Sequence, residues 1–211
     1  MSKVKIAVLA SGGGTNLQAL IDARDAGTLK SGELALVLAS KSSAYALERA
    51  KAAGIETVVV SRKKFDNREE FTHEIVRVLK EHDIGLIVLA GFLYILSPEF
   101  TENFANRVIN VHPALIPAFS GEGCYGLHVH EMALERGVKL TGASVHFVNE
   151  VTDGGPIILQ KAVAVEDFDT PETLQLRVMQ QAEWKILPEA AELFCAGRLE
   201  IVDNKVRILP E

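Results

Sequence analysis

Asn110 and His112 are the residues of this chain whose types and spacing most clearly suit chemistry. They alternate with Ile109 and Val111 in a short apolar run that ends at Pro113. If this run is a β-strand, both polar side chains lie on one face. They also lie at its carboxyl end, where open α/β sheets bind ligands, because proline cannot continue the ladder of hydrogen bonds. An amide beside an imidazole can stabilise a carbonyl oxygen that gains negative charge. The alternative is a strand end whose polar groups are satisfied locally.

A glycine-rich turn at residues 12–14 offers a second candidate site. It follows an apolar run and opens an amphipathic stretch, so unpaired N–H groups at a helix start would favour an anion. A dinucleotide-binding turn would require glycine at Leu17, and a Walker loop would require Gly-Lys-Ser/Thr after the glycines. We therefore expect a site for one terminal phosphate, with backbone and side-chain donors from Gly14, Thr15 and Asn16. The alternative is a tight turn that needs glycine only for its dihedral angles.

An irregular acidic segment, residues 148–156, lies between two apolar runs and contains Asp153. Gly154 and Gly155 are expected to let the backbone beside this carboxylate approach a ligand. A carboxylate here can pair with His112 and raise the pKa of the imidazole above that of an unpaired histidine. The three candidate groups are then expected to converge on one cleft. The alternative is an exposed turn rich in aspartate and glycine.

The rest of the sequence predicts the elements that position these residues. In the first half, apolar runs alternate with amphipathic stretches, which indicates βαβ units and a parallel sheet. Expected strands cover residues 4–9, 34–39, 57–60, 86–89 and 108–112, and expected helices cover 16–26, 44–53 and 68–81, with a short helix opening at Ser97. The last two of these strands are expected to be central.

The second half has a different pattern. Longer strand runs at 141–147 and 157–165 indicate antiparallel strands, and further expectations are a helix near 130–135, a long helix from Thr170 to Gly197 and a hairpin over 199–209. The fold class is therefore α/β, a Rossmann-like, mostly parallel twisted sheet flanked by helices with antiparallel strands in the second half. We expect one domain over residues 1–211, with a phosphate-binding half (1–112) and a catalytic half (113–211).

Composition and charge exclude several classes of function. With 28 acidic against 22 basic residues the net charge is −6, and no basic cluster is interleaved with aromatic residues, so a nucleic-acid surface is not expected. The N-terminus reads as a strand rather than a signal peptide, so we expect a cytoplasmic protein with no membrane segment. Cys124 and Cys195 fit no metal or redox spacing and are expected to be free thiols. His128 and His130 lack a third ligand at a usual spacing, so no metal is expected.

Three motifs in this order resemble one family. They are Ser11-Gly-Gly-Gly-Thr-Asn-Leu-Gln18, Asn110-Val-His-Pro-Ala-Leu-Ile-Pro117 and Asp153-Gly-Gly-Pro156. From the first strand through Gly197 the chain resembles the phosphoribosylglycinamide formyltransferases of purine biosynthesis. The resemblance implies the formyltransferase fold, 10-formyltetrahydrofolate as co-substrate and formyl donor, and glycinamide ribonucleotide as acceptor. It implies small-molecule substrates, no metal, and a monomer or homodimer.

The resemblance also implies roles for individual residues. Asn110, His112 and Asp153 would be catalytic. The ribonucleotide would be bound by Gly14, Thr15, Asn16, Gln180 and Glu183, the last two being three positions apart and so on one helix face. The folate would contact Arg68, Leu93, Tyr94, Ile95, Leu96, Asn110, Asn149, Glu150, Val151, Thr152 and Asp153. The chain departs from the family at Tyr94, where many members have arginine, and at the long loop 121–126, which is expected to be a lid over the folate.

Of three alternative functions, a hydrolase and a binding module remain open at this point, whereas the basic surface that a methionyl-tRNA formyltransferase needs is not predicted. A formyltetrahydrofolate hydrolase shares the catalytic set but uses water as acceptor and usually has a regulatory domain. A methionyl-tRNA formyltransferase needs a further RNA-contacting domain and a basic surface. A non-catalytic nucleotide-binding α/β module would explain the glycine turn but would leave Asn110, His112 and Asp153 without a role.

Overall fold

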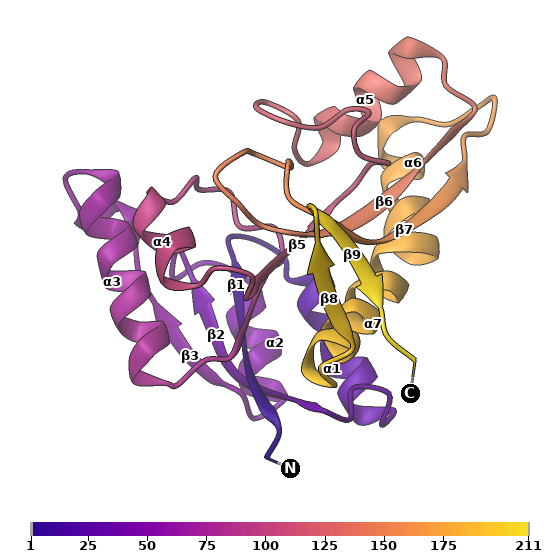
Figure 1. The fold of residues 1–211 in the computed structure, drawn as a ribbon. Helices are drawn as coiled ribbons and strands as arrows, with labels where there is room; N and C mark the ends of the chain where they lie inside the picture. The colour runs from indigo at the N-terminus through magenta and orange to yellow at the C-terminus, as the bar shows by residue number, and fades with distance from the viewer. Residues whose placement is uncertain (1, 211) are drawn as a thin grey trace.

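A seven-stranded sheet with strand order β3-β2-β1-β4-β5-β6-β7 forms the centre of the computed structural model, which describes residues 2–210 (Figure 1). Strands β1 to β5 are parallel, and β6 and β7 are antiparallel to their neighbours. The predicted fold class is therefore confirmed, including the central place of β4. The strands are β1 (Val4–Ala10), β2 (Gly32–Ala39), β3 (Glu56–Val59), β4 (Leu86–Leu89), β5 (Val108–His112), β6 (Leu140–Phe147) and β7 (Ile157–Ala164).

Helices cover both faces of the sheet and form two hydrophobic cores. One core joins the sheet to α1, α2, α5, α6 and α7, and the other joins it to α3 and α4. The helices are α1 (Thr15–Asp25), α2 (Ala46–Ala52), α3 (Arg68–Glu81), α4 (Pro98–Asn103), α5 (Leu127–Arg136), α6 (Pro171–Val178) and α7 (Trp184–Cys195), and a 3₁₀ turn covers Arg62–Lys64. Strands with apolar residues on both faces are typical of a parallel sheet covered on both sides.

Strand β5 shows the alternation that the sequence predicts. Ile109 and Val111 pack in the core with α1 and α7, whereas Val108 packs in the opposite core with α3 and α4. Asn110 and His112 therefore lie on the same face of β5 as Val108. They are at the carboxyl end of the strand, beyond the part that the hydrophobic core covers. The fold itself places an amide and an imidazole side by side.

The predicted long helix after Thr170 is present, but a π turn interrupts its regular α spacing in the middle. It begins as expected, because the Thr170 hydroxyl accepts a hydrogen bond from the Thr173 N–H and Pro171 occupies the first turn. A five-residue π turn, Met179–Glu183, then separates α6 from α7. Such π turns are rare in proteins, and many of those known lie at functional sites. The wider turn changes which residues share a helix face.

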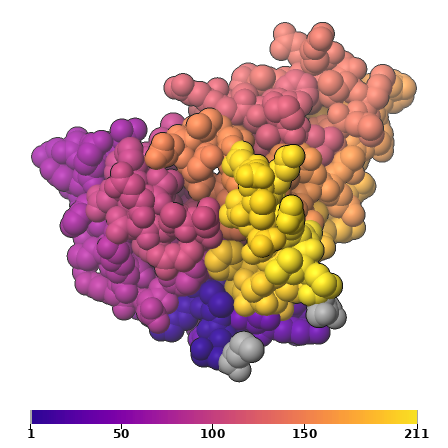
Figure 2. All heavy atoms as spheres, in the orientation of Figure 1, coloured from indigo at the N-terminus to yellow at the C-terminus, as the bar shows by residue number. Residues whose placement is uncertain are grey.

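The C-terminal hairpin, β8 (Leu199–Val202) and β9 (Lys205–Ile208), turns at Asp203 and Asn204 as predicted. Figure 2 shows it as a yellow segment on the surface, between the indigo-to-magenta first half and the orange part of the second half. Within residues 2–210, no helix has the length and apolar character needed to cross a membrane.

Candidate active site

One cleft of about 980 Å³ lies at the carboxyl ends of β1, β4 and β5. Its lining includes the glycine turn, the β5 pair Asn110 and His112, the loop 121–126 and the acidic segment 148–153. The predicted convergence of Asn110, His112 and Asp153 on one cleft is therefore confirmed. This is the position at which open α/β sheets bind ligands.

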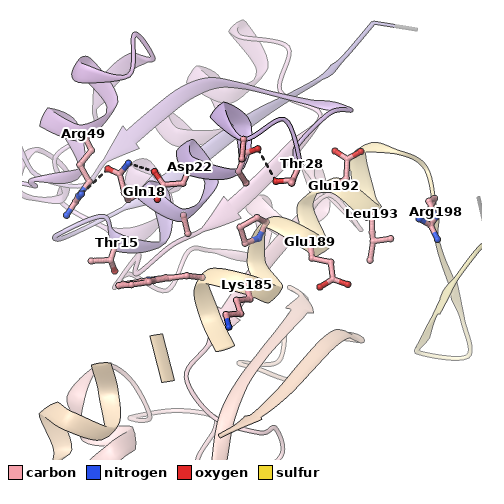
Figure 3. Close-up of a pocket in the computed structure, with 15 residues that line it drawn as sticks. Thr15, Gln18, Asp22, Thr28, Arg49, Lys185, Glu189, Glu192, Leu193 and Arg198 are labelled. Atoms are coloured by element: carbon pink, nitrogen blue, oxygen red, sulfur yellow. Dashed lines mark hydrogen bonds between the residues drawn. The ribbon is translucent and has the colours of Figure 1, made fainter. Parts of the chain in front are cut away.

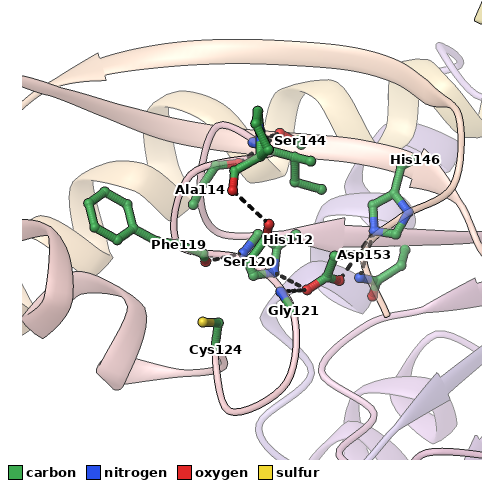
Figure 4. Close-up of polar contacts among 12 residues, drawn as sticks. His112, Ala114, Phe119, Ser120, Gly121, Cys124, Ser144, His146 and Asp153 are labelled. Atoms are coloured by element: carbon green, nitrogen blue, oxygen red, sulfur yellow. Dashed lines mark hydrogen bonds and ion pairs between the residues drawn. The ribbon is translucent and has the colours of Figure 1, made fainter. Parts of the chain in front are cut away.

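His112 and Asp153 line the cleft and lie side by side (Figure 4). The His112 Nδ1 lies 3.5 Å from the Asp153 Oδ2, and both side chains are buried. The His112 Nε2 donates to the Phe119 carbonyl oxygen at 2.8 Å, and the Gly121 N–H donates to the same Asp153 oxygen at 2.9 Å. The loop after β5 therefore contacts His112 and Asp153 themselves, rather than only the outer part of the cleft.

The protonation of this pair differs from the sequence-based expectation. Burial lowers the pKa of His112 below that of an ordinary histidine, and the Asp153 carboxylate and the Phe119 carbonyl compensate only in part. The expectation of a raised pKa was therefore wrong, because removal from water disfavours the cation more than one carboxylate at 3.5 Å favours it. Burial raises the pKa of Asp153, but the neighbouring histidines His146 and His112 and the hydrogen bond from the Gly121 N–H outweigh it and keep the pKa below its usual value.

We expect the titration of His112, followed by NMR, to have its midpoint below about 6.5, the value of an unperturbed histidine. The Asp153→Asn substitution should lower this midpoint further, because it removes the charge that favours the imidazolium. Half-exposed His82, which lies outside the cleft, serves as an internal reference that the substitution should leave unchanged. A His112 midpoint that does not move would show that Asp153 is not its electrostatic partner.

His146 is a site residue that does not stand out in the sequence, because it lies between Val145 and Phe147 in an expected strand. It faces Asn110 across the β5–β6 ladder, and the Asn110 Nδ2 donates to its Nε2 at 3.2 Å. Its Nδ1 donates to the Phe147 carbonyl at 2.8 Å, so in the neutral ring Nε2 is the acceptor. The same Nε2 lies 3.5 Å from the Asp153 Oδ1. The His146 Nε2 therefore lies between the Asn110 amide and the Asp153 carboxylate. The register of the two strands was the missing signal.

The second glycine after Asp153, Gly155, is required by the course of the backbone. A Cβ at Gly155 would lie 1.8 Å from the Phe147 carbonyl oxygen of β6, so only glycine allows the loop to pass so close to the strand. Asp153 itself has a φ of 53°, in the left-handed region that aspartate tolerates better than most residues. The loop thus crosses β6 beside His146 and directs its carboxylate at the histidines.

The glycine turn has the form of an anion site. Gly14 occupies the N-cap position of α1 without a side-chain cap, which leaves backbone N–H groups at the helix start unpaired by a cap. Its φ is 72°, and a Cβ there would lie 2.8 Å from the Ala46 Cα of α2. A larger residue at this position therefore disturbs the packing of α2 as well as any ligand, so a change at Gly14 cannot isolate phosphate binding.

A residue of helix α2 that the sequence analysis missed, Arg49, contacts the glycine turn. The Arg49 Nε donates to the Gly13 carbonyl and its Nη1 donates to Gln18, each at 2.9 Å. Gln18 donates in turn to Asp22 at 2.8 Å. Figure 3 shows this chain of side chains along a second cavity, of about 730 Å³, between α1 and α7. These hydrogen bonds hold the glycine turn in place, and the Arg49 guanidinium lies beside it.

Of the two residues expected on the last helix, only Glu183 lies in the cleft. It is buried and accepts a hydrogen bond from the Asn16 Nδ2 at 2.7 Å. Gln180 is exposed and does not line the cleft, whereas Met179 does. The expectation that residues three apart share a face was wrong here because the π turn changes the spacing.

The residues expected to frame the folate form the outer part of the cleft. Leu93, Ile95 and Val151 are exposed apolar side chains on two facing loops. Tyr94 packs edge-on against Phe71 and Phe92. All of the residues expected at the folate lie in the lining of this cleft: Arg68, Leu93, Tyr94, Ile95, Leu96, Asn110, Asn149, Glu150, Val151, Thr152 and Asp153.

Comparison with known proteins agrees with this geometry. The formyl transferase family model matches residues 4–191. A phosphoribosylglycinamide formyltransferase of Haemophilus influenzae is 42% identical over 200 residues, which cover 95% of this chain and 91% of the relative. The chain is also 42% identical to the trifunctional purine biosynthetic protein adenosine-3 of Gallus gallus, but spans only 19% of the length of that relative.

A solved structure gives the same result for the fold. The crystal structure of glycinamide ribonucleotide transformylase 1 from Symbiobacterium toebii superimposes with a TM-score of 0.92 at 40% identity, over 99% of this chain and 95% of that one. Sequence and fold therefore both agree with the family match. The chain belongs to the formyl transferase family, and within it to the phosphoribosylglycinamide formyltransferases.

Proposed function

We propose that this protein transfers the formyl group from 10-formyltetrahydrofolate to the amine of glycinamide ribonucleotide, yielding formylglycinamide ribonucleotide and tetrahydrofolate in purine biosynthesis. The observation that carries the proposal is that one cleft contains an anion turn, an apolar outer wall and, between them, Asn110, His112 and Asp153. An acceptor with a phosphate and a donor with an aromatic ring system would meet at these three residues.

The inner end of the cleft suits the ribonucleotide. Its phosphate would take backbone N–H groups of the glycine turn and the start of α1, where the helix dipole favours negative charge. The Thr15 hydroxyl is a further donor. Glu183, a buried carboxylate that lines the same cleft, would accept hydrogen bonds from sugar hydroxyls.

The outer end suits the folate. Exposed leucine, isoleucine and valine side chains on loops 93–96 and 148–152 would cover the two faces of a flat ring system. Arg68, at the start of α3, would place a guanidinium near the carboxylates of the folate tail. The cleft volume of about 980 Å³ accommodates both substrates at once.

In the proposed reaction the amine attacks the formyl carbon and the formyl oxygen becomes an anion. Asn110 and His112 would donate hydrogen bonds to this oxygen, with Asn110 held in place by His146. Asp153 would favour the charged form of His112 during the reaction. It would also take the proton of the amine and pass it, directly or through water, to the departing folate nitrogen as the carbon–nitrogen bond breaks.

This mechanism requires the loop after β5 to move. The His112 Nε2–H already donates to the Phe119 carbonyl, and one oxygen of the Asp153 carboxylate already accepts from the Gly121 N–H. The formyl oxygen would replace the carbonyl as the acceptor of that proton. We therefore assign the loop to opening and closing over the catalytic pair as well as over the folate.

An absorbance assay of formyl transfer, run with and without glycinamide ribonucleotide, tests the proposed function. We expect release of tetrahydrofolate that depends on the ribonucleotide. Release at the same rate without it would mean that water is the acceptor, as in a formyltetrahydrofolate hydrolase. No release in either condition, together with ribonucleotide binding, would indicate a binding module and overturn the proposal.

A further inference from the structure

The side chain of Asn16 forms a direct link between the two ends of the proposed ribonucleotide site. Asn16 is in the first turn of α1, beside the phosphate turn, and Glu183 ends the π turn between α6 and α7. The Asn16 Nδ2 donates to the Glu183 Oε2 at 2.7 Å, and both side chains are buried and line the cleft. The sequence analysis counted this amide among the phosphate donors.

The orientation of the amide argues against that role. One of its two N–H groups is directed at a carboxylate, and its Oδ1 is buried without a hydrogen-bond partner among the described residues. An oxygen cannot donate to a phosphate, whereas the backbone N–H groups of the turn can. Because a phosphate carries the same sign of charge as Glu183, one side chain that donates to both would bring two anions together.

We propose that the Asn16 side chain is a positioning residue for sugar recognition, which holds the Glu183 carboxylate ready to accept the hydroxyls of the ribonucleotide and takes no part in phosphate binding. The proposal rests on the proposed function, since the ribonucleotide defines the sugar. It separates two adjacent residues by role, with Thr15 serving the phosphate and Asn16 the sugar.

Glu183 needs such a partner because it is almost entirely removed from water. A buried carboxylate without donors becomes protonated instead of remaining charged. Burial raises the pKa of Glu183 to about 7, even though the Asn16 hydrogen bond lowers it. Without the amide, the acid form would be favoured further, and it would offer an O–H where the sugar hydroxyl needs an acceptor.

The experiment compares kcat/KM of wild type, Asn16→Ala and Thr15→Ala for three acceptors: glycinamide ribonucleotide, its dephosphorylated form, and an analogue without the ring hydroxyls. For Asn16→Ala we expect a loss of about tenfold or more with the first two acceptors, the value of a hydrogen bond to a charged group. With the third acceptor the loss should be less than about twofold. Thr15→Ala, the matched control on the same turn, should show the opposite dependence and lose activity only where phosphate is present.

A pH profile adds a readout that a general packing defect would not alter. In Asn16→Ala, kcat/KM for the ribonucleotide should recover between about pH 7 and pH 9, because Glu183 regains its charge as the pH rises through its raised pKa. Glu183→Gln keeps the shape of the side chain. In this background, adding Asn16→Ala should lower kcat/KM for the ribonucleotide little further. If Asn16→Ala alone lowers the melting temperature, this double-variant comparison still tests whether Asn16 acts through Glu183.

An Asn16→Ala loss that disappears with the dephosphorylated acceptor would overturn the proposal, because it would place the amide on the phosphate. Additive losses in the Glu183→Gln background would also overturn it. Wild-type activity that does not depend on the ribonucleotide would instead overturn the proposed function itself, and this inference with it. The folate KM, measured alongside, should be the same in all variants.

Discussion

Replacement of Asp153 by asparagine is expected to lower the turnover number for formyl transfer about 10²- to 10⁴-fold, the range usually supplied by a positioned acid–base group. Asparagine keeps the shape of the side chain and can still accept the Gly121 hydrogen bond, but it has no charge and cannot take a proton. Single-turnover kinetics with both substrates saturating measure the chemical step directly.

Because the pKa of Asp153 lies below its usual value, the carboxylate is charged throughout the neutral range, and wild-type activity should fall only as the pH drops towards that pKa. The variant should lack this acidic limb. Glu150→Gln, a change to another carboxylate in the same loop, is a matched control. Because Glu150 lies in the proposed folate part of the cleft, its loss should appear in the folate KM, with most of the turnover at saturating folate retained. Equal losses in both variants would point to the conformation of the loop rather than to the Asp153 carboxylate.

The Asn110→Ala substitution is expected to cost about 10²- to 10³-fold in turnover, as found when one donor to a developing oxyanion is removed in other enzymes. The loss should appear in kcat more than in KM, because the negative charge on the formyl oxygen develops only as the amine attacks. Steady-state kinetics with each substrate varied in turn give this division.

Two measurements separate this role from a structural one. The melting temperature should change little, since Asn110 is only partly buried and its side-chain hydrogen bond is to His146. A His146→Phe variant, which leaves Asn110 in place but removes its partner, should lose less activity than Asn110→Ala. A larger loss in the His146 variant would mean that the imidazole, not the amide, acts on the substrate.

The sequence predicts the elements well because its local signals agree with one another. Strands β4 and β5 and helix α3 lie at the predicted residues, since an apolar run or an amphipathic stretch is bounded there by clear turn signals. The interruption after α6 was not predictable in the same way. Nothing local in Met179–Glu183 marks a π turn, and the hydrogen bond that Glu183 accepts there comes from Asn16, 167 positions away.

The site shows the same division between local and distant information. Asn110 and His112 follow from strand alternation, but His146 enters the site only through the pairing of β5 with β6. The lowered pKa of His112 depends on how completely the loop and the sheet exclude water, which is a property of the closed fold. Arg49 was missed for a similar reason, since its contact with Gly13 exists only once α2 lies behind the turn.

The pairing of Asn110 with His146 has a consequence for how this protein can vary. The two residues are cross-strand partners, so the ladder fixes their separation whatever connects the strands. The intervening segment, 113–139, can gain or lose residues at 122–125 without moving either side chain, whereas one residue inserted within β6 would turn His146 to the opposite face. Natural diversity and engineered changes of substrate range are therefore expected to concentrate in the connection, with the paired strands unchanged in length.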